Sequence, residues 1–219
     1  MVYLRRPVTF VPLFIMLPFL TFGDLDLPKD HILAQHEMRL DNRHEDPWVN
    51  EVFKDNILLN LAYLRDPNIP NPPNWDQVRK SFQYQFILDP NRTFTFHDDI
   101  LEKYQGKVVH TNAHFNFKEG FRSSGYLFGD GVCHLASLIY WVAKDADLEA
   151  EAPTNHDFRN IPDIPKEFGV SIYANPFNKG ANTRQNLYIT NNKSEPIIFK
   201  FEYDGDKIKV SVVELNKNL

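Results

Sequence analysis

The chain has 219 residues and a formal net charge of −5, with 42% hydrophobic and 24% charged residues. This length suffices for one domain with its own hydrophobic core, with or without an N-terminal appendage. The acidic balance and the absence of a lysine and arginine cluster argue against a nucleic-acid partner, and we expect none. The single cysteine excludes an intramolecular disulfide, so packing must supply the stability.

Residues 1–23 are typical of a signal peptide or a membrane anchor. Arg5 and Arg6 form a basic flank before Val8–Phe22, an uncharged and mostly apolar run. This run is shorter than the roughly 20 residues of a membrane span, which favours a signal-peptide core. Left uncleaved, the segment would anchor the chain in a membrane. Both interpretations place the rest of the chain outside the cytoplasm; the alternative is a buried N-terminal segment.

The folded domain is predicted to begin at Asn50 and to extend to residue 219. Residues 24–49 have sparse apolar positions, so we expect a polar linker with one weak helix at most. Asn50–Arg65 is a predicted helix with Asn50 as its N-cap. Its apolar residues recur at helical spacing: Phe53, Ile57, Leu61 and Leu64.

Strand-like patterns follow on both sides of the chain's centre. Phe86–Leu88 and Thr93–Phe96, joined by a turn, predict a strand–turn–strand unit. The tail carries further strand-like runs at Phe168–Tyr173, Gln185–Thr190, Pro196–Tyr203 and Lys207–Val213. Because no helical pattern separates these runs, we expect an antiparallel meander and therefore an α+β fold.

The central stretch Gly129–Lys144 carries the lone cysteine. Gly129 and Gly131 suit a sharp turn into a helix. Val132–Ala143 is apolar on every helical face, which predicts a buried helix packed on the C-terminal sheet. Cys133 falls in the first turn, where free N–H groups and the helix dipole favour a thiolate.

Cys133 and His156 are the candidate catalytic residues. Papain-like chemistry needs a thiolate, a histidine as general base and acid, and commonly a third group that orients the ring. His156 lies between the helix and the tail strands, an order typical of a transglutaminase-like or papain-like layout. His134 would point about 100° away from Cys133 on a helix, which makes it a poor base. The alternative is a structural cysteine, because free cysteine usually behaves as a small buried hydrophobe.

A metal site is a rival hypothesis for another histidine group. His110 and His114 are four residues apart, and with His97 and Asp98 or Asp99 they offer metal ligands. The segment lacks a helical pattern that would align them, so we expect no metal. No phosphate-binding loop or dinucleotide fingerprint occurs, and we expect no cofactor.

Several motifs occur in a fixed order between Asp55 and Glu214. They are Asp55-Asn56-Ile57 with Ala62, Leu88–Phe96, Gly120–Arg122 with Gly125-Tyr126, Gly129–Tyr140, Asn155-His156 and Asn191–Ile197. This ordered set resembles the VanW-like family, named after a protein of vancomycin-resistance clusters. Residues 50–219 would then form a VanW-like α+β domain.

The chain departs from the family pattern at two places. His134 stands where family members usually have glutamine, and Gly169–Ile172 stands where they usually have a "D-A-T-V" run. If that aspartate orients the histidine in other members, Asp157 or Asp163 would have to replace it here.

The resemblance implies an exported cell-envelope protein, secreted or held at the membrane by its N-terminal segment. One function that it allows is a cysteine-dependent amide hydrolase or transferase acting on envelope peptides. The alternative is a non-catalytic cell-wall binding or accessory domain. In that case the abundant aromatic residues, 18 Phe and 9 Tyr, would line a groove for a wall peptide or glycan.

Overall fold

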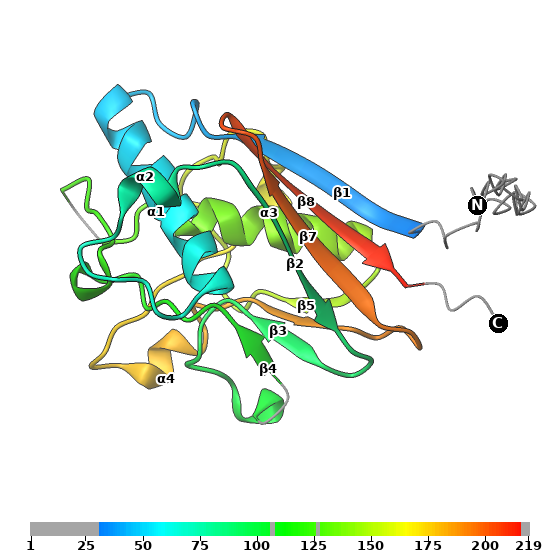
Figure 1. The fold of residues 1–219 in the computed structure, drawn as a ribbon. Helices are drawn as coiled ribbons and strands as arrows, with labels where there is room; N and C mark the ends of the chain where they lie inside the picture. The colour runs from blue at the N-terminus through cyan, green and yellow to red at the C-terminus, as the bar shows by residue number, and fades with distance from the viewer. Residues whose placement is uncertain (1–30, 106–107, 126–127, 216–219) are drawn as a thin grey trace, which may run out of the picture.

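The computed structural model describes residues 31–105, 108–125 and 128–215, which form two four-stranded sheets and a small number of helices (Figure 1). The predicted α+β class is confirmed. The predicted signal peptide or anchor at residues 1–23 lies outside the described residues. No helix among the residues described has both the length and the apolar character needed to cross a membrane.

The first sheet is antiparallel throughout and has the strand order β1-β8-β7-β2. Its strands are β1 His31–Arg39, β8 Lys207–Glu214, β7 Ile197–Tyr203 and β2 Phe82–Leu88. Residues alternate between the two faces: Phe199 and Phe201 of β7 are buried, whereas Lys200 and Glu202 are partly exposed. The strands β7 and β8 confirm the last two predicted runs.

The second sheet has the order β4-β3-β6-β5 and is mixed. It consists of β4 Val108–His110, β3 Thr93–Thr95, β6 Tyr188–Thr190 and β5 Glu149–Glu151. β3 runs parallel to β4 and antiparallel to β6. The predicted strand–turn–strand unit is therefore wrong in its pairing, because β2 and β3 enter different sheets. The predicted meander is wrong as well, since β6 pairs with β3 and Phe168–Tyr173 contains no strand.

The segment predicted as a polar linker contributes a strand instead. His31–Arg39 forms β1, which pairs along its length with β8. Its apolar residues are sparse because an edge strand is half exposed: Met38 is buried, whereas Ile32 is exposed. The ordered fold thus begins before Asn50, and the linker prediction is wrong for this strand.

Two long helices, α1 Pro47–Arg65 and α3 Val132–Asp145, pack against each other. The short helices are α2 Trp75–Val78, α4 Lys179–Asn182, η1 Glu102–Tyr104, η2 Phe117–Glu119 and η3 Lys166–Phe168. Helix α1 begins at Pro47, because proline is well accommodated in the first turn of a helix. The preceding residue, Asp46, is therefore the N-cap. The predicted cap Asn50 lies inside the helix, where its side chain binds Leu40 O and Arg43 N.

The core lies between the helices and the two sheets. α3 packs against β1 and β8, on the face of the first sheet opposite its solvent-exposed side. Phe86 of β2 stacks on Phe94 of β3 at 5.3 Å and on Phe199 of β7 at 5.2 Å between ring centroids. These offset aromatic contacts join the two sheets into one core.

Candidate functional site

The turn before α3 is held by helix α1. Gly131, the N-cap of α3, has a φ of 100°, and a Cβ there would lie 2.8 Å from the carbonyl oxygen of Phe53. The Asn56 amide donates to the carbonyls of Arg122 and Asp130 at 3.0 and 2.9 Å, and its oxygen accepts from the Arg122 N–H at 2.8 Å. Helix α1 therefore fixes where α3 begins.

Cys133 lies in the first turn of α3, and its side chain is hydrogen-bonded to the backbone of one other segment. Its Sγ accepts from the Ile172 N–H at 3.4 Å, and the thiol donates to the Ile172 carbonyl at 3.6 Å. Burial raises the pKa of the Cys133 thiol to about 11. Burial therefore opposes the thiolate that the helix start was expected to favour.

Ser137 lies one turn after Cys133 on the same face of α3 and binds the same segment. Its hydroxyl donates to the Cys133 carbonyl at 2.7 Å and accepts from the Val170 N–H at 2.8 Å. Together the two side chains attach the extended segment Val170–Ile172 to the helix.

We expect Ser137→Ala to lower the free energy of unfolding by about 2 kcal/mol, because it leaves the buried Val170 N–H without an acceptor. Urea unfolding followed by circular dichroism measures this loss. Ser81→Ala, at an exposed position, is the control. Equal losses in the two variants would contradict the proposed attachment.

His156 belongs to a cluster of rings rather than to a thiol pair. Its ring lies 6.2 Å from that of His134 in an edge-on arrangement and 4.0 Å from that of Phe158. Burial lowers the pKa of His156, which favours the neutral form of the ring. Its Nδ1 is buried and has no hydrogen-bond partner.

Both candidate catalytic residues adjoin the segment 169–172, but no hydrogen bond joins their side chains. The His156 N–H donates to the Gly169 carbonyl at 3.1 Å, and the Cys133 thiol bonds Ile172. His134, which the helical spacing turns away from Cys133, is the ring that contacts His156. The catalytic role of Cys133 and His156 stays a prediction.

Of the two aspartates considered as a third catalytic group, Asp163 has other partners. Its carboxylate pairs with the buried Arg43 and accepts from Asn42 and from the Arg39 N–H. Burial lowers the pKa of Arg43, and the carboxylate opposes that shift. Asp163 thus anchors the chain after β1.

A cavity of about 380 Å³ lies beside His156. It is lined by His156, Arg159, Asn160, Ile161, Pro162, Ile164, Pro165, Lys166 and Gly169. The lining contains three basic side chains and no acidic one. Gly169 is required here for space, because a Cβ would lie 2.5 Å from the His156 carbonyl oxygen.

The histidines of the metal hypothesis have separate partners. His97 is buried and bonds the Gln185 carbonyl at 2.9 Å, and His110 bonds the Thr111 carbonyl. His114 binds Asp98 and Glu119, which raise its pKa to about 9. Among the described residues, no group of three or more His, Cys, Asp or Glu could hold a metal ion.

The sequence did not predict a buried ionic centre on α1. Asp55 is 0% exposed, and its carboxylate accepts from Arg79 Nε and Nη2 at 2.8 Å each and from Arg122 Nη1. The only signal was its position next to Asn56 in a motif that holds the turn before α3. This centre couples α1, α2 and the segment entering α3.

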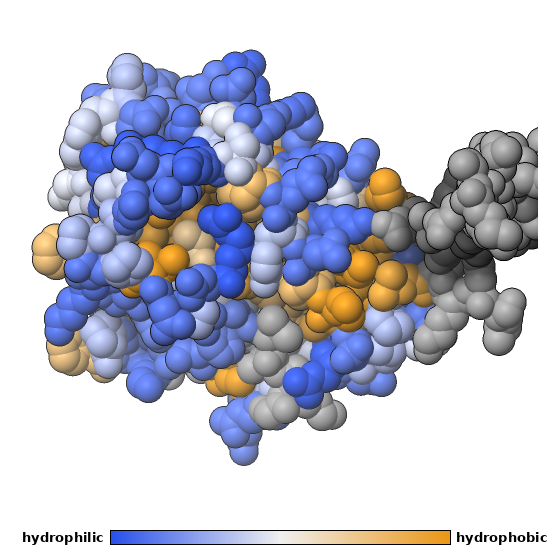
Figure 2. Space-filling view, viewed as in Figure 1, coloured by the Kyte–Doolittle hydropathy of each residue, from blue (hydrophilic) through white to orange (hydrophobic). Residues whose placement is uncertain are grey.

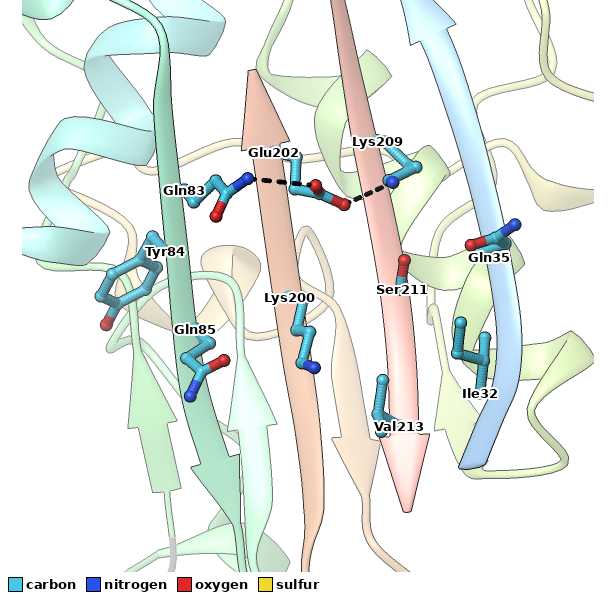
Figure 3. Close-up of a pocket in the computed structure, with 10 residues that line it drawn as sticks. All are labelled: Ile32, Gln35, Gln83, Tyr84, Gln85, Lys200, Glu202, Lys209, Ser211 and Val213. Carbon is cyan, nitrogen blue, oxygen red and sulfur yellow. Dashed lines mark hydrogen bonds and ion pairs between the residues drawn. The ribbon is translucent and has the colours of Figure 1, made fainter. Parts of the chain in front are cut away.

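The outer face of the first sheet forms a shallow polar hollow of about 630 Å³ (Figure 3). Glu202 accepts there from Gln83 at 3.5 Å and pairs with Lys209 at 2.5 Å. Hydrophilic residues cover much of the surface seen in Figure 2, with apolar patches where β1 begins. A polar surface of this kind is expected on the solvent-facing side of an antiparallel sheet.

Comparison with protein-family models gives a match over the C-terminal part of the chain. A family model described as "VanW like protein" matches residues 78–213. This range covers more than half of the 219 residues and includes the first turn of α3 and the cavity beside His156. No curated protein and no solved structure shows a significant match.

Proposed function

The chain belongs to the VanW-like family, and on this premise we propose that it is a non-catalytic binding or accessory domain of the cell envelope. Its ligand would be an envelope peptide or glycan, bound in the cavity beside His156. The observation that carries the proposal is that both hydrogen bonds of the Cys133 thiol go to the Ile172 backbone. A thiol held in this way supports a structural role for Cys133.

The cavity supports binding in a second way. A neutral imidazole with a buried, unpartnered nitrogen lines it together with cationic and apolar side chains. Concave sites that combine apolar walls with a few polar groups are typical of small-ligand binding.

We expect Cys133 to react with iodoacetamide at pH 7 at least about tenfold more slowly than the same thiol in the urea-unfolded chain. The reason is a pKa raised to about 11, which leaves little thiolate. Mass spectrometry of the alkylated protein measures both rates. A folded-state rate equal to or above the unfolded rate would contradict a structural thiol.

Incubation with purified envelope peptides tests the function directly. We expect wild type and Cys133→Ala to bind the same fragments with equal affinity and to cleave none. Calorimetry measures binding, and mass spectrometry detects cleavage. Cleavage by wild type that Cys133→Ala abolishes without unfolding would instead establish the cysteine-dependent hydrolase or transferase, with the transglutaminase-like or papain-like layout predicted for it.

The same proposal places the domain outside the cytoplasm, secreted or attached to the membrane by residues 1–23. The basic pair Arg5-Arg6 and the apolar run that follows support this placement. Fractionation of cells expressing the full chain tests it, and recovery of the protein only in the cytoplasm would contradict it.

A further inference from the structure

The cavity beside His156 has a charge pattern opposite to that of the whole chain. The chain carries a net charge of −5, yet the cavity lining contains His156, Arg159 and Lys166 and no carboxylate. Asp163, between two lining residues in sequence, is paired with Arg43. A local excess of cationic and N–H groups attracts an anion.

His156, which lines this cavity, also contains a buried polar atom that has no hydrogen-bond partner. The residue is only 7% exposed, and its Nδ1 has no partner. Buried polar atoms are nearly always paired, and an exception in a cavity wall calls for a ligand or an ordered water. A neutral imidazole with its proton on Nδ1 can donate to a bound oxygen.

Arg159 contributes a second polar group to the same cavity wall. Its side chain is exposed, and its Nη2 lies 3.0 Å from His44 Nε2. An arginine guanidinium carries five N–H donors and no acceptor. The guanidinium nitrogens other than Nη2 can therefore donate to a bound oxyanion.

We propose that this cavity binds an oxyanion, a carboxylate or a phosphate, carried on a short stem. Arg159 and Lys166 supply positive charge, the His156 ring donates from Nδ1, and the walls Ile161 and Ile164 contact the stem. A volume of about 380 Å³ fits a compact group rather than a long chain. The inference rests on the proposed function and names the chemistry of its ligand.

Small probes test the proposal on the purified chain at pH 7. N-acetylglycine carries a carboxylate, N-acetylglycinamide is its neutral counterpart, and methyl phosphate is a phosphate monoester. We expect N-acetylglycine or methyl phosphate to bind and to shift the ring resonances of His156 in nuclear magnetic resonance spectra. The tighter of the two identifies the natural group. Equal binding of N-acetylglycine and its amide would overturn the proposal.

Charge variants test which residues bind the probe. Arg159→Gln and Lys166→Gln should each weaken the affinity about tenfold, the loss expected for one charged hydrogen bond. Both positions are exposed, so the variants should fold. Arg184→Gln, exposed and outside the cavity, is the matched control and should bind as wild type does. Equal weakening by Arg184→Gln would overturn the assignment.

The outcome for this inference is separable from that for the proposed function. If the anionic probes bind as expected but no envelope fragment binds, the oxyanion site stands and the envelope function fails. If envelope fragments bind wild type and Arg159→Gln equally well, and the anionic probes do not bind, the binding function stands and the oxyanion inference fails.

Discussion

Replacing Asp55 with asparagine should lower the free energy of unfolding by about 3 to 5 kcal/mol. The Asp55 carboxylate is 0% exposed and accepts charged hydrogen bonds from Arg79 and Arg122. An amide keeps the size but loses the charge, and its NH₂ group opposes the arginine donors. The loss is large because the carboxylate itself is buried and holds three segments together.

Urea unfolding of wild type and Asp55→Asn measures this effect. Asp89→Asn is the matched control, because Asp89 is exposed in the turn after β2. We also expect faster hydrogen exchange at the Arg122 amide, which Asn56 holds next to the ionic centre. A loss no larger than that of Asp89→Asn would contradict a stabilising role for the buried pair.

Elements with a strong local pattern were predictable from the sequence. The apolar run after Gly131 gave helix α3, and the alternating tail gave β7 and β8 nearly to the residue. In these segments the buried residues recur with the period of the helix or strand, so the pattern of apolar residues in the sequence predicts the element that forms.

Elements that depend on distant partners were not predictable. The strand β1 has too few apolar residues to stand out, because β8 supplies its hydrogen bonds and one side stays in solvent. The division into two sheets depends on which strands pair. The sequences of β2 and β3, which are neighbours in the chain, do not indicate that the two strands belong to different sheets. Strand pairing is decided by the whole chain.

For the candidate site, too, the sequence predicted the local structure but not the contacts between distant segments. The sequence located Cys133 in the first turn of a helix and His156 after it, as the structure also has them. It could not reveal that the thiol bonds Ile172 or that the His156 ring contacts His134. The direction of a side chain depends on contacts between segments far apart in the sequence.

Acidification from pH 7 to pH 5 should lower the free energy of unfolding, by at most about 2 kcal/mol for each histidine whose pKa is lowered by burial. Burial lowers the pKa of His97, His134 and His156. The unfolded chain therefore binds more protons than the folded chain below about pH 6.5, and stability falls as the pH falls. His114, with a pKa raised to about 9, acts in the opposite direction and offsets a small part of the loss.

His134 should account for about 2 kcal/mol of this loss, because its pKa lies well below the ordinary value. Besides burial, the positive charges of Arg43 and Arg159 and the rings of His44 and His156 oppose its protonation. His134→Gln should therefore reduce the pH dependence by this amount in urea unfolding series at pH 7 and pH 5.

His31→Gln, at an exposed position on β1, is the matched control and should keep the full pH dependence. An unchanged pH dependence in His134→Gln would show that another group takes up the proton. An oxyanion in the cavity would stabilise the protonated ring of His156, which lines it. Bound N-acetylglycine or methyl phosphate should thus reduce the acid sensitivity of wild type, and less so that of Arg159→Gln, since the same cationic wall holds the anion.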